Sequence, residues 1–135
     1  MNVETIATKD VITVRESDSM LSASSLLKQI GIRHLPVLDD REHLVGVVTD
    51  RDIKRASASE ATSLDIHEML YLVDKIAVSR VMSREPIAVA PDTSAQEAAK
   101  LMVDRKIGCL PVVNGEKLVG IVTGIDLLGL VARAG

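Results

Sequence analysis

The nine residues LVGVVTDRD at positions 44–52 recur, with three substitutions, as LVGIVTGID at positions 118–126. Both copies contain the pattern G-h-h-T-x-x-D, where h is an aliphatic residue and x is any residue. An apolar run that leads into a threonine, with an acid three residues later, predicts a buried strand followed by a capped helix. The duplication indicates that the chain consists of two repeats.

The similarity extends well beyond these nine residues. At an offset of 75, ITVRESDSMLSASSLLKQIGIRHLPVL (residues 12–38) aligns with IAVAPDTSAQEAAKLMVDRKIGCLPVV (residues 87–113). The offset falls to 74 where DDREH (residues 39–43) faces NGEK (residues 114–117), and a solvated hairpin loop tolerates such a change of length. Asn114-Gly115 predicts a type I′ turn, because both central positions of that turn require positive φ.

Each repeat has the predicted order β-α-β-β-α. The predicted strands are Val11–Val14, His34–Leu38 and Leu44–Val48 in the first repeat, and Ile87–Val89, Cys109–Val113 and Leu118–Val122 in the second. The first helix of each repeat is expected to be capped by Ser17 or Asp18, and by Asp92 or Thr93, and a last helix to follow Thr49 and Thr123. Gly31 predicts a helix end, whereas Lys106 at the matching position gives no such signal.

The duplication divides the chain into a first repeat (1–55), a connector (56–76) and a second repeat (77–135). Within the connector, SASEATS (57–63) is typical of a loop, and LDIHEMLYLVDKI (64–76) predicts an amphipathic helix capped by Thr62 or Ser63. A repeat of this size would bury little apolar surface alone. We therefore expect the two repeats to face each other across a pseudo-two-fold axis and to share a core.

Composition excludes several classes of function. The 135 residues carry a net charge of −3. They contain no Trp, no Phe and a single Tyr, Tyr71. A nucleic-acid partner is disfavoured, because it requires a basic surface and, for single strands, aromatic stacking platforms. No apolar run approaches the roughly 20 residues that span a bilayer. The single cysteine, Cys109, and an N-terminus unlike a signal peptide predict a cytoplasmic protein.

The repeated pattern has a chemical interpretation and a structural one. The glycine would allow a ligand to approach the backbone closely, and the threonine with the free helical N–H groups would suit a phosphate. The aspartate could accept hydrogen bonds from two vicinal hydroxyls of a ribose. Alternatively, T-x-x-D only caps the helix, and the two roles are compatible. The residues concerned are Gly46, Thr49 and Asp52, and Gly120, Thr123 and Asp126.

This pattern, together with Leu35-Pro36 and Leu110-Pro111 at the start of each hairpin, resembles a tandem pair of CBS domains, or Bateman module. The connector is similar to that of CBS proteins of the acetoin-utilisation type, which usually have a further C-terminal domain. The resemblance implies an α/β (α+β) fold of two repeats and a non-enzymatic sensor of an adenine nucleotide: AMP, ADP or ATP, with NAD or S-adenosylmethionine as alternatives. It also implies a homodimer formed through helical faces, and a regulated partner protein. The other interpretation is an interaction module without a physiological nucleotide.

The resemblance further implies two ligand clefts, each formed by both repeats. The first would contain Thr49, Arg51, Asp52, Ser83, Ile87, Ala88, Ile107 and Gly108, and the second Thr8, Ile12, Thr13, Ile32, Arg33, Thr123, Ile125 and Asp126. Arg51, Lys54 and His34 of the first repeat match Ile125, Leu128 and Cys109 of the second. We therefore count His34 among the nucleotide-binding residues, and expect the Asp52 cleft to bind phosphorylated ligands more tightly.

The sequence offers little support for other chemistry. His34 and Cys109 occupy matching positions, but two ligands without a supporting cluster make a poor zinc site. No recognisable nucleophile motif and no glycine-rich phosphate loop is present in the sequence. An enzyme is therefore disfavoured.

Overall fold

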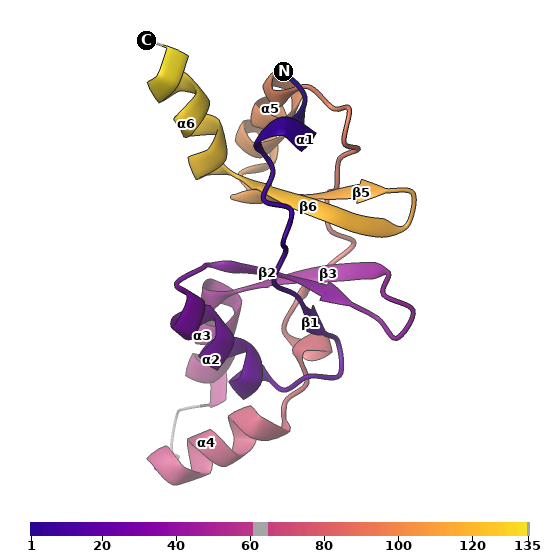
Figure 1. Ribbon diagram of the computed structural model, residues 1–135. Coiled ribbons are helices and arrows are strands. Elements are labelled where there is room, and N and C mark those ends of the chain that lie inside the picture. Colours follow the sequence, from indigo (N-terminus) through magenta and orange to yellow (C-terminus); the bar gives the residue numbers. More distant parts are fainter. Residues whose placement is uncertain (61–64, 135) are drawn as a thin grey trace. The chain divides into compact units, whose positions relative to one another are not determined.

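The computed structural model describes residues 1–60 and 65–134, which fall into two compact units (Figure 1). Unit 1 consists of Met1–Val11 and Pro86–Gly135, and unit 2 of Ile12–Glu85. Each unit therefore combines most of one repeat with the first residues of the other, 1–11 of the first repeat and 77–85 of the second. The predicted segments 1–55, 56–76 and 77–135 follow the duplication in the sequence, so they differ from these units.

Unit 2 contains one four-stranded sheet in the order β1-β2-β3-β4. Strand β1 pairs with β2 in parallel, and the other neighbours are antiparallel. The hairpin strands are confirmed, the first strand is shorter than predicted, and β4 was not predicted. The elements are β1 (Val14–Arg15), α2 (Met20–Ile30), β2 (His34–Leu38), β3 (Leu44–Thr49), α3 (Asp50–Glu60), α4 (Ile66–Lys75), the 3-10 helix η1 (Val78–Arg80) and β4 (Ser83–Arg84).

Unit 1 repeats this arrangement around a two-stranded antiparallel sheet. Val89 forms a parallel bridge to Val112 on one side, and Thr8 forms an antiparallel bridge to Ile121 on the other. The strand predicted at Ile87–Val89 is thus reduced to a single bridge. The elements are α1 (Val3–Ile6), α5 (Ala95–Arg105), β5 (Cys109–Asn114), β6 (Lys117–Thr123) and α6 (Gly124–Ala134). The mixed fold of two β-α-β-β-α repeats is therefore as predicted.

Helices α2 and α5 begin slightly later than predicted. Ser19 caps α2 by accepting a hydrogen bond from the backbone N–H of Ser22 at 3.0 Å. The predicted cap Asp18 instead accepts from the backbone N–H of Arg15, which closes the turn before the helix. Likewise Ser94, and not Asp92 or Thr93, caps α5.

The two helices end alike despite different residues. Gly31 ends α2 in the left-handed conformation with φ of 75°, as predicted. Lys106 adopts the same conformation after α5, with φ of 55°. The missing glycine has therefore not changed the end of the helix, although a side chain in this conformation carries a steric cost.

The hairpin turn of unit 1 differs from the prediction. Asn114 pairs with Lys117, so the central positions are Gly115 and Glu116. Of these two residues, only Gly115 has a positive φ, which is 65°. A type I′ turn needs positive φ at both positions, so that prediction is wrong. The register places Asn114 at the end of the strand, outside the turn.

The connector contains more helix than predicted. Residues 57–60, assigned to a loop from the sequence, continue α3 to Glu60, because no glycine or proline interrupts a run of compatible residues. At the start of α4, the Asp65 carboxylate accepts a hydrogen bond from the backbone N–H of Glu68 at 2.8 Å. The predicted caps Thr62 and Ser63 lie outside the described residues.

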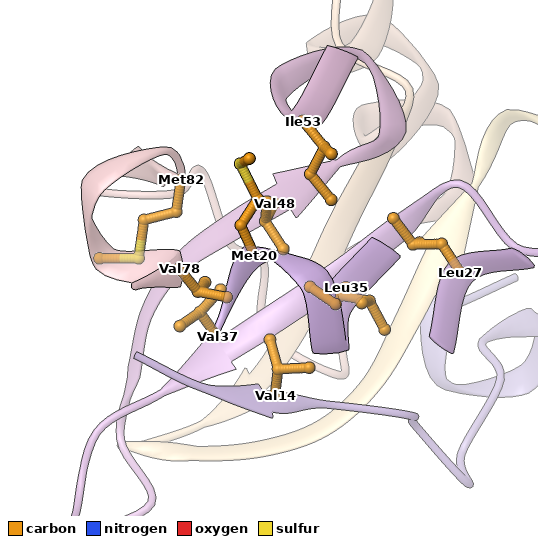
Figure 2. Close-up of a cluster of buried hydrophobic side chains, with 10 residues drawn as sticks. Val14, Met20, Leu27, Leu35, Val37, Val48, Ile53, Val78 and Met82 are labelled. Carbon is orange, nitrogen blue, oxygen red and sulfur yellow. The ribbon is translucent and has the colours of Figure 1, made fainter. Parts of the chain in front are cut away.

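Each unit has its own core of buried apolar side chains. In unit 2 the core lies between the sheet and α2, and Val78 and Met82, from the start of the second repeat, belong to it (Figure 2). In unit 1, Val3 from the start of the chain joins the cluster around Leu110. The sequence predicted one core shared by the repeats. The structure instead has two cores, and each is completed by the first residues of the opposite repeat.

Among residues 1–60 and 65–134, no helix combines the length and the apolar character needed to cross a membrane.

Candidate functional site: the two threonine–aspartate turns

The turn from β3 into α3 is closed by reciprocal hydrogen bonds between Thr49 and Asp52. The backbone N–H of Thr49 donates to Asp52 Oδ2 at 2.9 Å. The backbone N–H of Asp52 donates to Thr49 Oγ1 at 3.1 Å. This is a capping box, so the structural interpretation of T-x-x-D is confirmed for the first repeat. We call residues 49–52 the first turn.

The corresponding turn from β6 into α6, residues 123–126, uses its hydroxyl group differently. The backbone N–H of Thr123 donates to Asp126 Oδ2 at 2.8 Å. The Thr123 hydroxyl also donates to Asp126 Oδ2, at 3.2 Å. The hydroxyl hydrogen is therefore engaged in this second turn, whereas in the first turn the hydroxyl accepts and its hydrogen can be donated elsewhere.

Both aspartates keep one carboxylate oxygen for a further partner. Within the described parts of the chain, the hydrogen bonds to Asp52 and Asp126 all go to Oδ2. Both residues are partly exposed. Because capping fixes the orientation of each carboxylate, Oδ1 is an acceptor held in a fixed position.

The glycine of each repeated pattern is explained by protein packing. A Cβ atom on Gly46 would lie 2.6 Å from Met82 Sδ and 2.8 Å from the carbonyl oxygen of Ser83. A Cβ atom on Gly120 would lie 3.1 Å from the carbonyl oxygen of Thr8. The sequence suggested that these glycines admit a ligand. What approaches them is the backbone near the start of the opposite repeat.

Met82 and Ala7, which also contact these glycine positions, were missed by the sequence analysis. The sequence does indicate these residues, because the similarity between the repeats continues upstream of the first strand of each repeat. IATK at residues 6–9 matches VMSR at residues 81–84 by conservative substitutions, at the same offset of 75. Continuing the alignment to the left would have identified both segments as part of the repeat.

The predicted site residues divide between the two units. Unit 2 contains Ile12, Thr13, Ile32, Arg33, His34, Thr49, Arg51, Asp52 and Ser83, and unit 1 contains Thr8, Ile87, Ala88, Ile107, Gly108, Thr123, Ile125 and Asp126. Within unit 2, the carbonyl oxygen of Arg33 accepts from the Asp50 N–H at 3.3 Å, beside the first turn. Within unit 1, Gly108 accepts in the same way from Gly124 at 3.2 Å. The grouping of Asp52 with Ile107, and of Asp126 with Arg33, stays a prediction.

The residue opposite each threonine differs in its chemistry. His34 pairs with Thr49 across the β2–β3 hairpin, and Cys109 pairs with Thr123 across β5–β6. Burial lowers the pKa of His34; Asp50 and, more weakly, Asp52 oppose this effect, and Arg33 adds to it. Burial raises the pKa of the Cys109 thiol to about 11. Both groups are therefore neutral in the folded protein at neutral pH.

The helices that follow the turns also differ. In α3, Arg51 is exposed, and the Lys54 ammonium lies 3.8 Å from the Asp50 carboxylate, so its charge is partly offset. In α6, the matching Ile125 and Leu128 are 75% and 64% exposed. The described residues contain no group of three or more side chains suited to hold a metal ion.

Comparison with known proteins fits this duplicated architecture. The family model of the CBS domain matches residues 3–59 and 78–133. The chain belongs to the CBS domain family. The CBS domain pair of protein MJ0100, solved with 5′-methylthioadenosine and S-adenosyl-L-methionine, is 29% identical, with a TM-score of 0.85 over 100% of this chain and 98% of that one. CBSX2 in complex with AMP is 29% identical, with a TM-score of 0.82 over 98% and 97%.

The expected likeness to the acetoin-utilisation type of CBS protein is also found. A candidate acetoin utilization protein from Vibrio cholerae is 30% identical, with a TM-score of 0.83 over 99% of this chain and 92% of that one. The chain spans 22–32% of the length of the first curated relatives that it matches.

Proposed function

We propose that this CBS pair is a regulatory module that binds a ligand containing adenosine at its threonine–aspartate turns. Two structurally similar CBS pairs support the ligand class, because one was solved with AMP and the other with 5′-methylthioadenosine and S-adenosyl-L-methionine. These molecules share an adenosine group. AMP, ADP and ATP are the first candidates, followed by NAD and S-adenosylmethionine.

The observation that carries the proposal is the fixed orientation of Asp52 and Asp126. Each carboxylate is held through Oδ2, which leaves Oδ1 as an acceptor for a ribose hydroxyl. The adjacent helix N-terminus favours an anionic group such as a phosphate. Because the chain has no Trp or Phe, aliphatic side chains and backbone groups would contact the adenine.

A second candidate function is an interaction module that acts through contacts with other proteins. It is favoured by the apolar side of α6, where Ile125, Leu128 and Val131 are 75%, 64% and 72% exposed. These residues recur every three positions, so they lie along one broad side of the helix. The homodimer expected for the family, or a contact with a regulated protein, would cover them.

The test is calorimetric titration of the full chain with AMP, ADP, ATP, NAD and S-adenosylmethionine, repeated with Asp52→Asn and Asp126→Asn. Asparagine keeps an oxygen for the cap but removes the charge. We expect at least one ligand to bind, and each variant to weaken binding about tenfold at its own turn. For a phosphorylated ligand, Asp52→Asn should have the larger effect.

Ser94→Ala is the control for a loss of stability, because it removes the cap of α5, which lies outside both turns. It should leave the affinity unchanged. The proposal would be overturned if none of the five ligands bound, or if the double variant Asp52→Asn/Asp126→Asn bound them as the wild type does. The interaction module would then be the better explanation.

A further inference from the structure

The two turns present different hydrogen-bonding groups to a ligand. In the first turn the Thr49 hydroxyl accepts from the Asp52 N–H, so its hydrogen can be donated to an acceptor such as a phosphate oxygen. In the second turn the Thr123 hydroxyl donates to Asp126, so it retains only acceptor capacity. A phosphate is an acceptor at neutral pH, and the second turn therefore offers it one donor fewer.

The side chains beyond each turn differ in the same direction. Arg51 is the second residue of α3, whereas Ile125 at the same place in α6 exposes 75% of its surface. One helical turn further, Lys54 of α3 is replaced by the exposed Leu128 of α6. A guanidinium group favours an anion, and an exposed isoleucine favours an apolar group, which would remove its surface from water.

The residue opposite the threonine completes the contrast. His34 is half-buried beside Thr49 and can donate a hydrogen bond from its ring. Cys109 is buried beside Thr123, and a neutral thiol is only a weak donor. These three differences, from the opposite strand, the turn and the helix, favour an anionic ligand at the first turn and disfavour it at the second. Asp50, which Gly124 replaces in the second turn, opposes them, and the Lys54 ammonium 3.8 Å from its carboxylate partly offsets that charge.

We propose that the two turns select different classes of adenosine ligand. The first turn binds a ligand with an anionic 5′ group, and the second binds one whose 5′ group is uncharged and apolar. This inference rests on the proposed function, since it requires that both turns bind adenosine. It adds that Arg51 and Ile125 determine the selectivity.

The experiment compares AMP with 5′-deoxyadenosine, in which a hydrogen atom replaces the 5′-phosphate ester, so that C5′ is an uncharged methyl group. Two-site fits to calorimetric titrations of the wild type, Asp126→Asn and Asp52→Asn assign an affinity to each turn, because each variant weakens binding at its own turn. We expect the first turn to prefer AMP by at least tenfold. The ratio of AMP affinity to 5′-deoxyadenosine affinity should be at least tenfold lower at the second turn than at the first.

Exchange variants assign the selectivity to individual residues. Arg51→Ile in the Asp126→Asn background should lower AMP affinity about tenfold and leave 5′-deoxyadenosine within twofold. Ile125→Arg in the Asp52→Asn background should raise AMP affinity by a similar factor. Val103→Arg is the control for added charge, because Val103 is also 75% exposed but lies on α5; it should leave both affinities unchanged.

The outcomes separate this inference from the proposed function. If neither ligand binds to either aspartate variant or to the wild type, the proposed function fails. If both ligands bind with the same ratio at the two turns, or if Val103→Arg raises AMP affinity as much as Ile125→Arg does, binding stands and the inference on selectivity is wrong.

Discussion

The carbonyl oxygen of Ser83 occupies the space that a side chain on Gly46 would need. A Cβ atom there would lie 2.8 Å from this oxygen, and the equivalent contact, from Gly120 to the carbonyl of Thr8, would measure 3.1 Å. The relationship thus occurs once in each unit. The glycine at the start of G-h-h-T-x-x-D therefore permits the close packing of a strand against the first residues of the opposite repeat.

Gly46→Ala is expected to destabilise the protein by about 2–3 kcal/mol, since overpacking of this kind typically costs about 1–3 kcal/mol. The neighbours are a backbone carbonyl and the Met82 sulfur, at 2.8 and 2.6 Å, and the carbonyl cannot move without disturbing the β3–β4 pairing. Gly120→Ala should cost less, about 1 kcal/mol, because its closest contact is longer. Chemical denaturation measures both values.

Gly124→Ala is the control for these glycine variants. Nothing lies within 4 Å of a Cβ atom at this position, and the residue begins α6. Alanine should therefore be neutral or stabilise the helix by up to about 1 kcal/mol. If Gly46→Ala proved as harmless as Gly124→Ala, the packing explanation would be wrong.

Lys106→Gly is expected to stabilise the protein, and Gly31→Lys to destabilise it, each by about 1 kcal/mol. Both residues end a helix in the left-handed conformation, which a side chain disfavours. A Cβ atom at Gly31 would meet nothing within 4 Å, so the effect comes from the backbone alone. Thermal melting of Lys106→Gly, Gly31→Lys and the double variant measures these changes in stability. Effects of the same sign in both single variants would contradict the prediction.

The stability of the protein should fall as the pH decreases below about 6.5, in part because of His34. Burial lowers the pKa of this residue from 6.5, so the fold favours the neutral imidazole. The stabilisation that comes from keeping His34 neutral is fully present above pH 6.5, and it is lost as the pH falls toward the lower pKa of the folded state. Melting temperatures at pH 7.5 and 5.5 should differ less for His34→Gln than for the wild type. An equal loss in both proteins would show that His34 contributes nothing in this range.

Cys109 should react very slowly with iodoacetamide in the folded protein. Burial raises the pKa of its thiol to about 11, so at pH 8 only about one thousandth would be thiolate, the reactive form. In guanidinium chloride, where the thiol is exposed and its pKa returns toward 9.0, alkylation should be at least tenfold faster. Mass spectrometry over time follows both reactions. Equal rates would mean that Cys109 is accessible in the folded chain.

The strands were predicted well where apolar runs in the sequence change abruptly to a polar loop. The hairpin strands were placed within about two residues, because apolar runs flank a loop whose length differs between the repeats. The helix starts were displaced because SDS (17–19) and DTS (92–94) each offer several capping residues. In the first group the Asp18 carboxylate accepts from the Arg15 N–H, and Ser19 is the cap.

The candidate site was predicted in part. The capping hydrogen bonds follow from T-x-x-D spacing, which is local and visible in the sequence. The direction of the Thr123 hydroxyl hydrogen bond is not encoded in that pattern, and it differs from that of Thr49. The contacts of Gly46 with Ser83 were missed because they join residues far apart in the chain, and no local propensity reports such packing.

The division of the chain into units also has a consequence for the order of folding during synthesis. Unit 2 is one continuous stretch, Ile12–Glu85, so all of its contacts are available once that stretch has left the ribosome. Unit 1 needs Val3 to pack with residues of the second repeat, such as Leu110, more than a hundred positions later. Loop-closure entropy and the direction of translation both delay this step. Val3 should therefore find its place in the core only after the second repeat has been synthesised.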